Sequence, residues 1–250
     1  MQRVESDSFG LIVIGDEILF GRRSDSHLEH FRHTLASRGL RLTRCWLLPD
    51  QTQTLVDHLR FSLRSGMPTF VCGGIGATPD DLTRPCAAQA AGVPLVRHPE
   101  ATALIEARFG DAAYPTRIRM ADLPRDCELI PNPHNQIPGF TLLQHHFLPG
   151  FPEMAWPMAD WVLENLYAGG HAPLQEASLL VLETPESTLV PLMEDFADCF
   201  PDFKLYSLPH LGETPKIELG LRGRGDIASA MTALVKALED AGIPHRDSCA

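Results

Sequence analysis

The fold is decided by the stretch Gly73-Gly74-Ile75-Gly76-Ala77-Thr78-Pro79-Asp80-Asp81-Leu82-Thr83. Its glycines follow a short apolar run, residues 69–72, which predicts a strand, and the pattern after it predicts a helix over 83–91. Glycine lacks a Cβ, so the backbone can turn sharply and bring its N–H groups close to a ligand. The helix start adds unpaired N–H donors and a partial positive charge. The stretch therefore predicts a phosphate-binding loop between a strand and a helix.

The two acids in this loop set it apart from the common phosphate-binding motifs. No Lys follows the last glycine, and the glycine spacing is not that of a dinucleotide-binding loop. Asp80 and Asp81 would repel a phosphate unless a divalent cation such as Mg²⁺, Mn²⁺ or Co²⁺ lay between them. Thr78-Pro79 and Thr83-Arg84-Pro85 also resemble helix starts. Helix capping alone does not account for three glycines with two adjacent acids.

Outward from the loop, short apolar runs alternate with amphipathic stretches. This pattern predicts strands over 9–14, 41–48, 128–130 and 146–148, and helices over 27–37, 52–65, 99–109 and 153–167. Such alternation predicts a mostly parallel mixed sheet with helices on both faces. Residues 169–173 are interpreted as a linker. Strands over 177–182, 204–208 and 216–221, with helices over 187–200 and 226–241, predict a small ferredoxin-like α+β domain after it. The predicted domains are 1–170 and 174–246.

Carboxylates follow two other predicted strands. Asp16 and Glu17 come after the first strand, and Asp50 follows the second. In open α/β sheets ligands bind at the carboxyl ends of the strands. Asp16 and Glu17 are turn residues on one interpretation and part of the site on the other. Together with the loop, these acids predict a metal held by Asp50, Asp80 and Asp81.

Two Pro-rich segments, 130–140 and 147–154, have two interpretations. Pro-Gly steps make tight turns, so both segments are ordinary turns on the first interpretation. On the second, they form another wall that binds a phosphate or a ring and faces the glycine-rich loop.

Composition excludes several classes of function. The net charge is −11, which argues against nonspecific nucleic-acid binding. No apolar stretch is long enough to span a membrane, and no signal peptide opens the chain, so a cytoplasmic protein is expected. The six cysteines lack close spacing, which favours free buried thiols. His27, His30 and His33 recur every third residue, a spacing that drifts by about 60° per step around a helix. They cannot all converge on one metal.

These motifs, in this order, resemble the MoaB/Mog-type molybdopterin-binding family and most closely its CinA-like branch. The resemblance covers residues 9–167. It rests on G-D-E-I-L-x-G at 15–21, G-G-x-G-x-T-x-D-D-x-T at 73–83, N-P at 132–133, P-G-F at 138–140 and P-G-x-P-x-E-M at 149–154. It implies a three-layer α/β/α sandwich and a homo-oligomer, either a dimer or a trimer. It also implies that Asp50 and Asp81 are the catalytic acids, which leaves a cap or a supporting role to Asp80.

The predicted ligand-binding residues lie in these motifs. They are Gly15, Asp16, Glu17, Gly21, Asp25, Gly73, Gly74, Gly76, Thr78, Thr83, Asn132, Pro138, Gly139, Pro149, Gly150 and Glu153. The sequence departs from the family pattern at three positions. His27 stands where an Asn usually follows Asp25-Ser26, and Ile75 and Ala77 replace the commoner Leu and Pro.

Three functions are compatible with these residues. The first is metal-dependent hydrolysis of a nucleotide pyrophosphate such as ADP-ribose, as the resemblance to CinA-like domains implies. The second is molybdenum cofactor biosynthesis, with molybdopterin as the ligand of an adenylyltransferase-like site. The third is a non-catalytic sensor of a small phosphorylated ligand.

Overall fold

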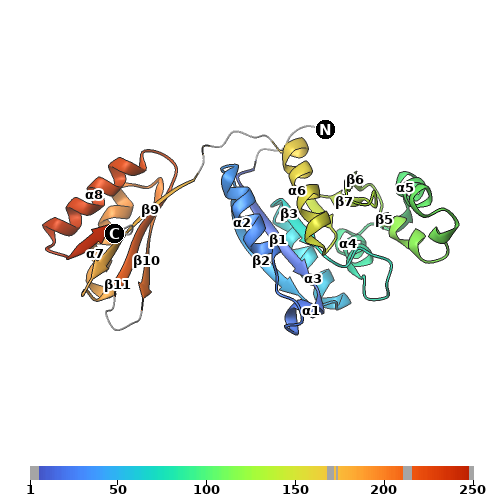
Figure 1. Ribbon diagram of the computed structural model, residues 1–250, viewed down its shortest axis with the longest axis horizontal. Helices are drawn as coiled ribbons and strands as arrows, with labels where there is room; N and C mark the ends of the chain where they lie inside the picture. The colour runs from blue at the N-terminus through green and yellow to red at the C-terminus, as the bar shows by residue number, and fades with distance from the viewer. Residues whose placement is uncertain (1–5, 168–171, 173, 211–215, 248–250) are drawn as a thin grey trace. The chain divides into compact units, whose positions relative to one another are not determined.

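The chain forms two compact units, Met1–His171 and Ala172–Ala250 (Figure 1). The computed structural model describes residues 6–167, 172, 174–210 and 216–247. Apart from Ala172, the predicted linker at 169–173 lies outside the described residues. No helix in the described ranges is long and apolar enough to cross a bilayer.

The first unit is built on a six-stranded mixed sheet with the order β2-β1-β3-β8-β7-β6. Its parallel strands are β1 (Ser8–Ile14), β2 (Arg41–Leu48), β3 (Thr69–Cys72) and β8 (His145–Leu148). Two further strands run antiparallel to their neighbours, β7 (Gly139–Leu142) and β6 (Glu128–Ile130). The four parallel strands are adjacent, so their carboxyl ends meet at one edge of the sheet.

Helices cover both faces of this sheet (Figure 1). One core cluster joins α2 (His27–Ser37) and α6 (Pro152–Leu166) to Leu11 and Val13 of β1. The other joins α3 (Thr52–Arg64), α4 (Thr83–Ala91) and α5 (Pro99–Phe109) to Ile12 and Ile14. Alternate residues of a strand point to opposite faces, so β1 is buried on both sides. The predicted α/β/α sandwich is confirmed.

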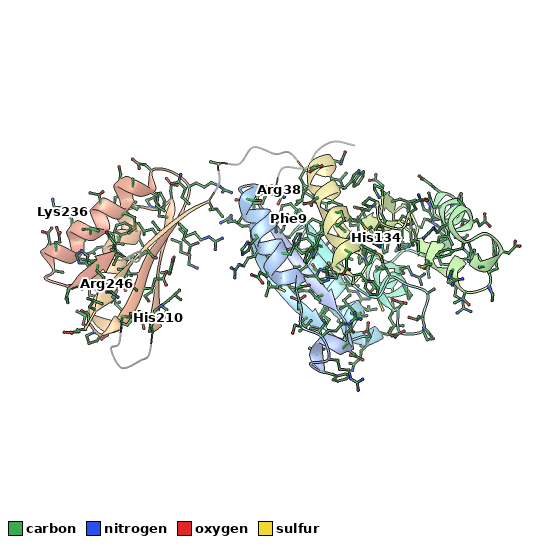
Figure 2. All side chains as sticks on the ribbon, in the orientation of Figure 1. Phe9, Arg38, His134, His210, Lys236 and Arg246 are labelled. Carbon is green, nitrogen blue, oxygen red and sulfur yellow. The ribbon has the colours of Figure 1, made fainter. Side chains whose placement is uncertain are left out.

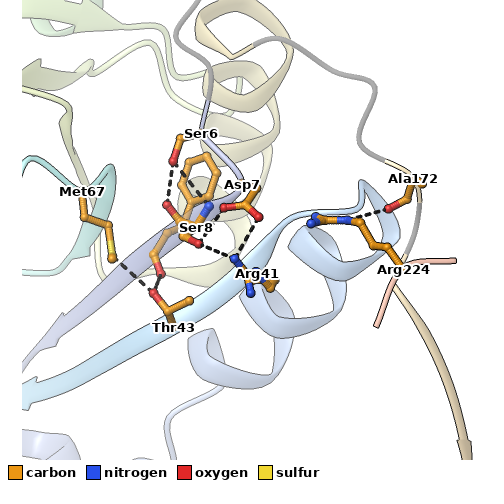
Figure 3. Close-up of polar contacts among 9 residues, drawn as sticks. Ser6, Asp7, Ser8, Arg41, Thr43, Met67, Ala172 and Arg224 are labelled. Atoms are coloured by element: carbon orange, nitrogen blue, oxygen red, sulfur yellow. Dashed lines mark hydrogen bonds and ion pairs between the residues drawn. The ribbon is translucent and has the colours of Figure 1, made fainter. Parts of the chain in front are cut away.

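Polar contacts hold the two helices of the first face together and fix the start of the sheet. Arg38, labelled in Figure 2, follows α2 and donates to Asp160 of α6 over 2.9 Å. Arg41 of the edge strand β2 donates to Asp7 over 2.9 Å, a contact drawn in Figure 3. The Thr43 hydroxyl donates to the Phe9 carbonyl over 3.2 Å.

Several short elements were not predicted. They are α1 (Asp16–Leu19), β4 (Leu95–Arg97), β5 (Asp122–Pro124) and the 3₁₀ turns η1 (Gly110–Ala113) and η2 (Arg117–Ala121). β7 was not predicted either, because a Pro-Gly step such as Pro138-Gly139 is typical of a turn or a ligand-binding loop and not of a strand. Gly139 instead begins a strand at a place where a Cβ would lie 2.4 Å from the Phe147 carbonyl oxygen.

The prediction of free cysteines is confirmed for those described, but the prediction that they are buried is wrong for two of them. Cys45 and Cys199 are exposed, whereas Cys72, Cys86 and Cys127 are buried. Cys45 lies on the edge strand β2, most of which is exposed, and Cys199 ends a surface helix of the second unit.

The second unit is an antiparallel sheet of order β10-β11-β9-β12 with two helices. Its elements are β9 (Gln175–Leu182), α7 (Glu186–Cys199), β10 (Phe203–His210), β11 (Lys216–Gly223), α8 (Ile227–Asp240) and β12 (His245–Asp247). This is the predicted ferredoxin-like arrangement, and β12, which was not predicted, completes its β-α-β-β-α-β order. Within this unit Arg224 donates to the Ala172 carbonyl over 3.1 Å (Figure 3). His210, labelled in Figure 2, lies 3.5 Å from Glu218.

Candidate functional site

A cavity of about 440 Å³ lies at the carboxyl ends of the four parallel strands. Each of these strands is followed by residues that line it. Gly15 and Glu17 follow β1, Asp50 follows β2, the glycine-rich loop follows β3, and Pro149 and Gly150 follow β8. The sheet topology therefore brings together segments that are far apart in the sequence, as expected for the edge of an open α/β sheet.

Thr83 and Arg84, at the start of α4, bind four successive carbonyl groups of the glycine-rich loop. The Thr83 hydroxyl donates to the Gly73 carbonyl over 2.8 Å, and the Thr83 N–H donates to the Gly74 carbonyl over 3.0 Å. Arg84 continues the series. Its Nε donates to the carbonyl of residue 75 over 3.1 Å, and one terminal nitrogen donates to that of residue 76 over 2.6 Å. We call these four bonds the carbonyl clamp.

The carbonyl clamp determines where the loop N–H groups point. A peptide unit is planar and trans, so the C=O of one residue and the N–H of the next point in opposite directions. With the carbonyls of residues 73–76 turned toward Thr83 and Arg84, the N–H groups of residues 74–77 point away from them. None of these four N–H groups bonds to another described residue. Residues 74–77 all line the cavity, so the loop presents four successive donors suited to an anion.

Asp81 stabilises the turn that closes the loop. Its Oδ2 accepts from the Thr78 N–H over 2.8 Å and from the Thr78 hydroxyl over 2.5 Å. Asp81 therefore caps this turn, and a hydrogen bond with the Thr78 side chain lowers the pKa of Asp80, so both acids contact Thr78. Asp80 is exposed and lines the cavity as well.

A second group of carboxylates lies where β1 and β2 end. The Asp16 N–H donates to Asp50 Oδ2 over 3.0 Å, and the Asp50 N–H donates to Asp16 Oδ1 over 3.3 Å. Burial raises the pKa of Asp50, and the nearby charges of Asp16, Glu17 and Asp80 raise it further, against a lowering by the Asp16 N–H. The cavity therefore combines anion-binding N–H groups on the glycine-rich loop with carboxylates on the ends of β1 and β2.

These carboxylates suit a cation that arrives with a ligand. Among the described residues, no three His, Cys, Asp or Glu side chains are gathered into a ready metal site. Mg²⁺ is usually held by one or two carboxylates together with substrate phosphates and water, rather than by an all-protein cage. Asp50, Asp80 and the second oxygen of Asp81 supply hard oxygen ligands of that kind. The donor chemistry thus fits a divalent cation completed by a phosphorylated ligand.

The opposite wall combines a buried amide with an exposed aromatic ring. Asn132 is 4% exposed, and its Oδ1 accepts from the His134 N–H over 3.0 Å, while its Nδ2 has no partner among the described residues. Phe151 is 51% exposed, and the Arg23 guanidinium lies 5.9 Å from its ring centroid. Both aromatic and cationic side chains therefore border the cavity.

Several lining residues were not among the predicted ligand-binding residues. Asn135, Ile137, Phe151 and Met154 lie in the two Pro-rich segments that one interpretation made a wall of the site, and the others are Ile14, Arg23, Ile75, Ala77 and Met120. The signal available for Phe151 was an aromatic residue in the Pro-Gly segment after a strand. Arg23 and Met120 carry no local pattern that distinguishes them from other surface or core residues.

Some predicted ligand-binding residues do not line this cavity. These are Asp16, Gly21, Asp25, Thr83, Pro138, Gly139 and Glu153. Two of them have clear structural roles. Asp25 accepts from the N–H groups of His27 and Leu28 at the start of α2, over 2.9 and 3.0 Å. Thr83 belongs to the carbonyl clamp.

His27, which replaces the usual Asn, does not line the cavity but contacts Gly150, which does. Its side chain is 4% exposed, and Nε2 lies 3.2 Å from the Gly150 carbonyl oxygen. Burial lowers its pKa, so the ring is neutral at pH 7, and the contact is a hydrogen bond from Nε2–H. His27 therefore links α2 to the segment after β8, and Nδ1 has no partner among the described residues.

Comparison with known proteins identifies the first unit. Residues 10–168 match the family model described as "Probable molybdopterin binding domain". The chain belongs to this molybdopterin-binding domain family. A CinA-like protein of Geobacter sp. (strain M21) is 32% identical over 229 residues, which are 88% of this chain and 55% of that protein. Another from Citrifermentans bemidjiense is 32% identical over 220 residues, 85% of this chain and 52% of that protein.

The crystal structure of CinA from Thermoplasma acidophilum superposes with a TM-score of 0.59 at 26% identity, covering 64% of this chain and 98% of that one. The resemblance to the CinA-like branch is thereby confirmed. The chain spans about half the length of the curated relatives that it matches.

Proposed function

We propose that the molybdopterin-binding domain binds a phosphorylated nucleotide or pterin and, with a divalent metal, hydrolyses the diphosphate of a nucleotide-linked compound such as ADP-ribose. One observation carries this proposal. Residues 74–77, whose N–H groups have no partner among the described residues, line the same cavity as the carboxylates Glu17, Asp50 and Asp80. Phosphate oxygens need the donors, and a metal-assisted displacement at phosphorus needs the carboxylates.

The residues divide the work of hydrolysis between two walls. The N–H groups of the glycine-rich loop hold the oxygens of the phosphate that is attacked. Asp50, which lines the cavity beside the glycine-rich loop, accepts a proton from the attacking water. The water oxygen bonds to phosphorus, and the bond from phosphorus to the bridging oxygen breaks. A divalent cation held by one or two of the carboxylates of Asp50, Asp80 and Asp81, together with the phosphate, would offset the charge that gathers on the phosphate oxygens.

The wall around Phe151 would bind the planar ring of the ligand. Its ring is half-exposed at the rim, so a purine or a pterin would find a stacking partner there. The unpartnered Nδ2 of Asn132 would gain an acceptor from the ligand after a small rotation. Both features favour a ligand that combines a ring with phosphate.

A second candidate is a step of molybdenum cofactor biosynthesis, favoured by the family match over residues 10–168. In that case the same loop would hold the pterin phosphate, and the carboxylates would serve adenylyl transfer from ATP. The homo-oligomer expected from the resemblance stays a prediction, and light scattering on the purified chain would check it.

The two candidates differ in their products. The purified chain is incubated with ADP-ribose, FAD or NADH together with Mg²⁺, Mn²⁺ or Co²⁺, and the release of AMP is measured. We expect release that requires metal and that is lost in Asp50→Asn and Asp81→Asn. Asp57→Asn is the matched control, because Asp57 is an exposed acid on α3 outside the cavity.

Each result selects one function. ATP-dependent modification of molybdopterin without AMP release from the other compounds would select the second candidate. Ligand binding without any turnover would leave a sensor. Equal loss of AMP release in Asp57→Asn and Asp50→Asn would contradict the assignment of the site.

A further inference from the structure

A second hollow lies on the other side of the glycine-rich loop. It has a volume of about 510 Å³ and shares Ala77 and Thr78 with the first cavity. Its opposite side is formed by residues 112–119 of the lobe between α5 and β5. The segment 77–79 thus separates an acidic cavity from this second hollow.

The second hollow is basic although the chain is acidic. Arg117 and Arg119 line it, and no carboxylate is among the described residues that do so. The Arg119 guanidinium makes no hydrogen bond or ion pair with any described residue, unlike Arg38, Arg41 and Arg97, each of which pairs with an Asp. A chain with a net charge of −11 has thus left a guanidinium uncompensated beside its candidate site.

Arg117 is held in place by its neighbours. One terminal nitrogen donates to the Ala112 carbonyl over 2.7 Å, and the guanidinium lies 4.8 Å from the centre of the Phe109 ring. A guanidinium has five N–H donors, so these contacts leave several free for a ligand. Holding the side chain in advance lowers the entropy that binding would cost.

Arg84 fixes the two walls of the hollow relative to each other. While Nε and one terminal nitrogen bind the loop, the other terminal nitrogen donates to the carbonyls of Arg119 and Asp122. Arg84 is 6% exposed, and burial lowers the pKa of its guanidinium. One buried side chain therefore links the loop that presents N–H donors to the turn that presents Arg119.

We propose that this hollow is a second phosphoryl-anion site, in which Arg117 and Arg119 bind a phosphomonoester group, either one carried by the intact ligand or the one that hydrolysis of a diphosphate leaves on a product. Guanidinium groups match the geometry of phosphate oxygens and bind them through paired hydrogen bonds. The identity of the whole ligand rests on the proposed function, but the binding of a phosphoryl anion does not.

Inorganic phosphate is the probe that tests this site directly. Arginine Nε–H and backbone amide signals are followed by ¹H–¹⁵N NMR at low ionic strength during a phosphate titration. We expect the Nε–H signal of Arg119, assigned by its loss in Arg119→Ala, to shift on binding. The double variant Arg117→Ala/Arg119→Ala should bind phosphate about tenfold more weakly at this site, and Arg119→Lys should retain part of the affinity.

Arg125→Ala is the matched control, because Arg125 is an exposed arginine that does not line the hollow. Equal weakening by Arg125→Ala would overturn the proposal, since it would show general charge attraction. A shift of the amides of residues 74–77 without any shift of the arginine signals would also overturn it. Failure of AMP release with the arginine signals still shifting would refute the proposed function and leave this site standing.

Discussion

Replacing Arg84 with methionine tests the carbonyl clamp, because methionine keeps much of the length of the side chain and removes every donor. Arg84 donates to four carbonyls, those of Ile75, Gly76, Arg119 and Asp122. A buried carbonyl that loses its partner costs about 1–3 kcal/mol. Water will hydrate some of the four carbonyls that Arg84 binds once its side chain is removed. If two of these carbonyls stay buried without a partner, the free energy of unfolding falls by about 2–6 kcal/mol, and we expect about 3 kcal/mol.

Tryptophan fluorescence during urea unfolding measures this change in the first unit alone. The three tryptophans, Trp46, Trp156 and Trp161, all lie in that unit. The matched control is Arg97→Met. Arg97 pairs with Asp122 over 2.6 Å, but their side chains are 43% and 30% exposed, so the loss should stay below about 1 kcal/mol.

The clamp also predicts a consequence for binding. Without Arg84, the carbonyls of residues 75 and 76 are free to rotate, and the N–H groups of residues 76 and 77 rotate with them. The phosphate-induced shifts of these two amides should therefore weaken in Arg84→Met more than those of residues 74 and 75, which Thr83 holds. Equal stability losses in Arg84→Met and Arg97→Met, with unchanged amide shifts, would refute this reasoning.

Burial lowers the pKa of His145 to about 4 and of His146 to about 3, below the ordinary value of about 6.5. Below pH 6.5 these histidines therefore bind protons in the unfolded chain but not in the folded chain. Each of them should lower the free energy of unfolding by up to about 1.4 kcal/mol for every pH unit below 6.5. A urea midpoint that does not change between pH 7 and pH 5 would contradict this. Gly73→Ala should lower the melting temperature several-fold more than Gly92→Ala does. A Cβ at residue 73 would lie 2.2 Å from the Ile14 carbonyl oxygen, whereas a Cβ at residue 92 would meet open space. Similar melting temperatures of the two variants would contradict this close approach.

The regular elements were predictable because their apolar periods are long. Helices α2, α4 and α5 and strands β2 and β3 have the predicted bounds, since each is marked by a turn residue at one end or both. β12 was missed because its sequence, His245-Arg246-Asp247, is polar. It pairs with β9 at the sheet edge through its backbone, which no side-chain pattern reveals.

The site was predictable only to the level of strand ends. Glycines and acids after strands identified three segments of the cavity wall, because the position of a strand end in a parallel sheet follows from the topology. The topology of the sheet does not determine the direction in which each peptide N–H of the loop points. Nothing local indicates that the Arg84 side chain reaches back to residues 75 and 76, because the helix start that positions it also suits a simple cap.

The carbonyl clamp explains how an acidic chain can offer a site for a phosphorylated ligand. Four outward N–H groups carry partial positive charge without adding a formal charge, so they coexist with Glu17, Asp50 and Asp80 in one cavity. A lysine in the loop would pair with those carboxylates when no ligand is bound, and the ligand would then have to break that pair. Backbone donors fixed from behind by Thr83 and Arg84 make no such pair, so the carboxylates stay available to a cation.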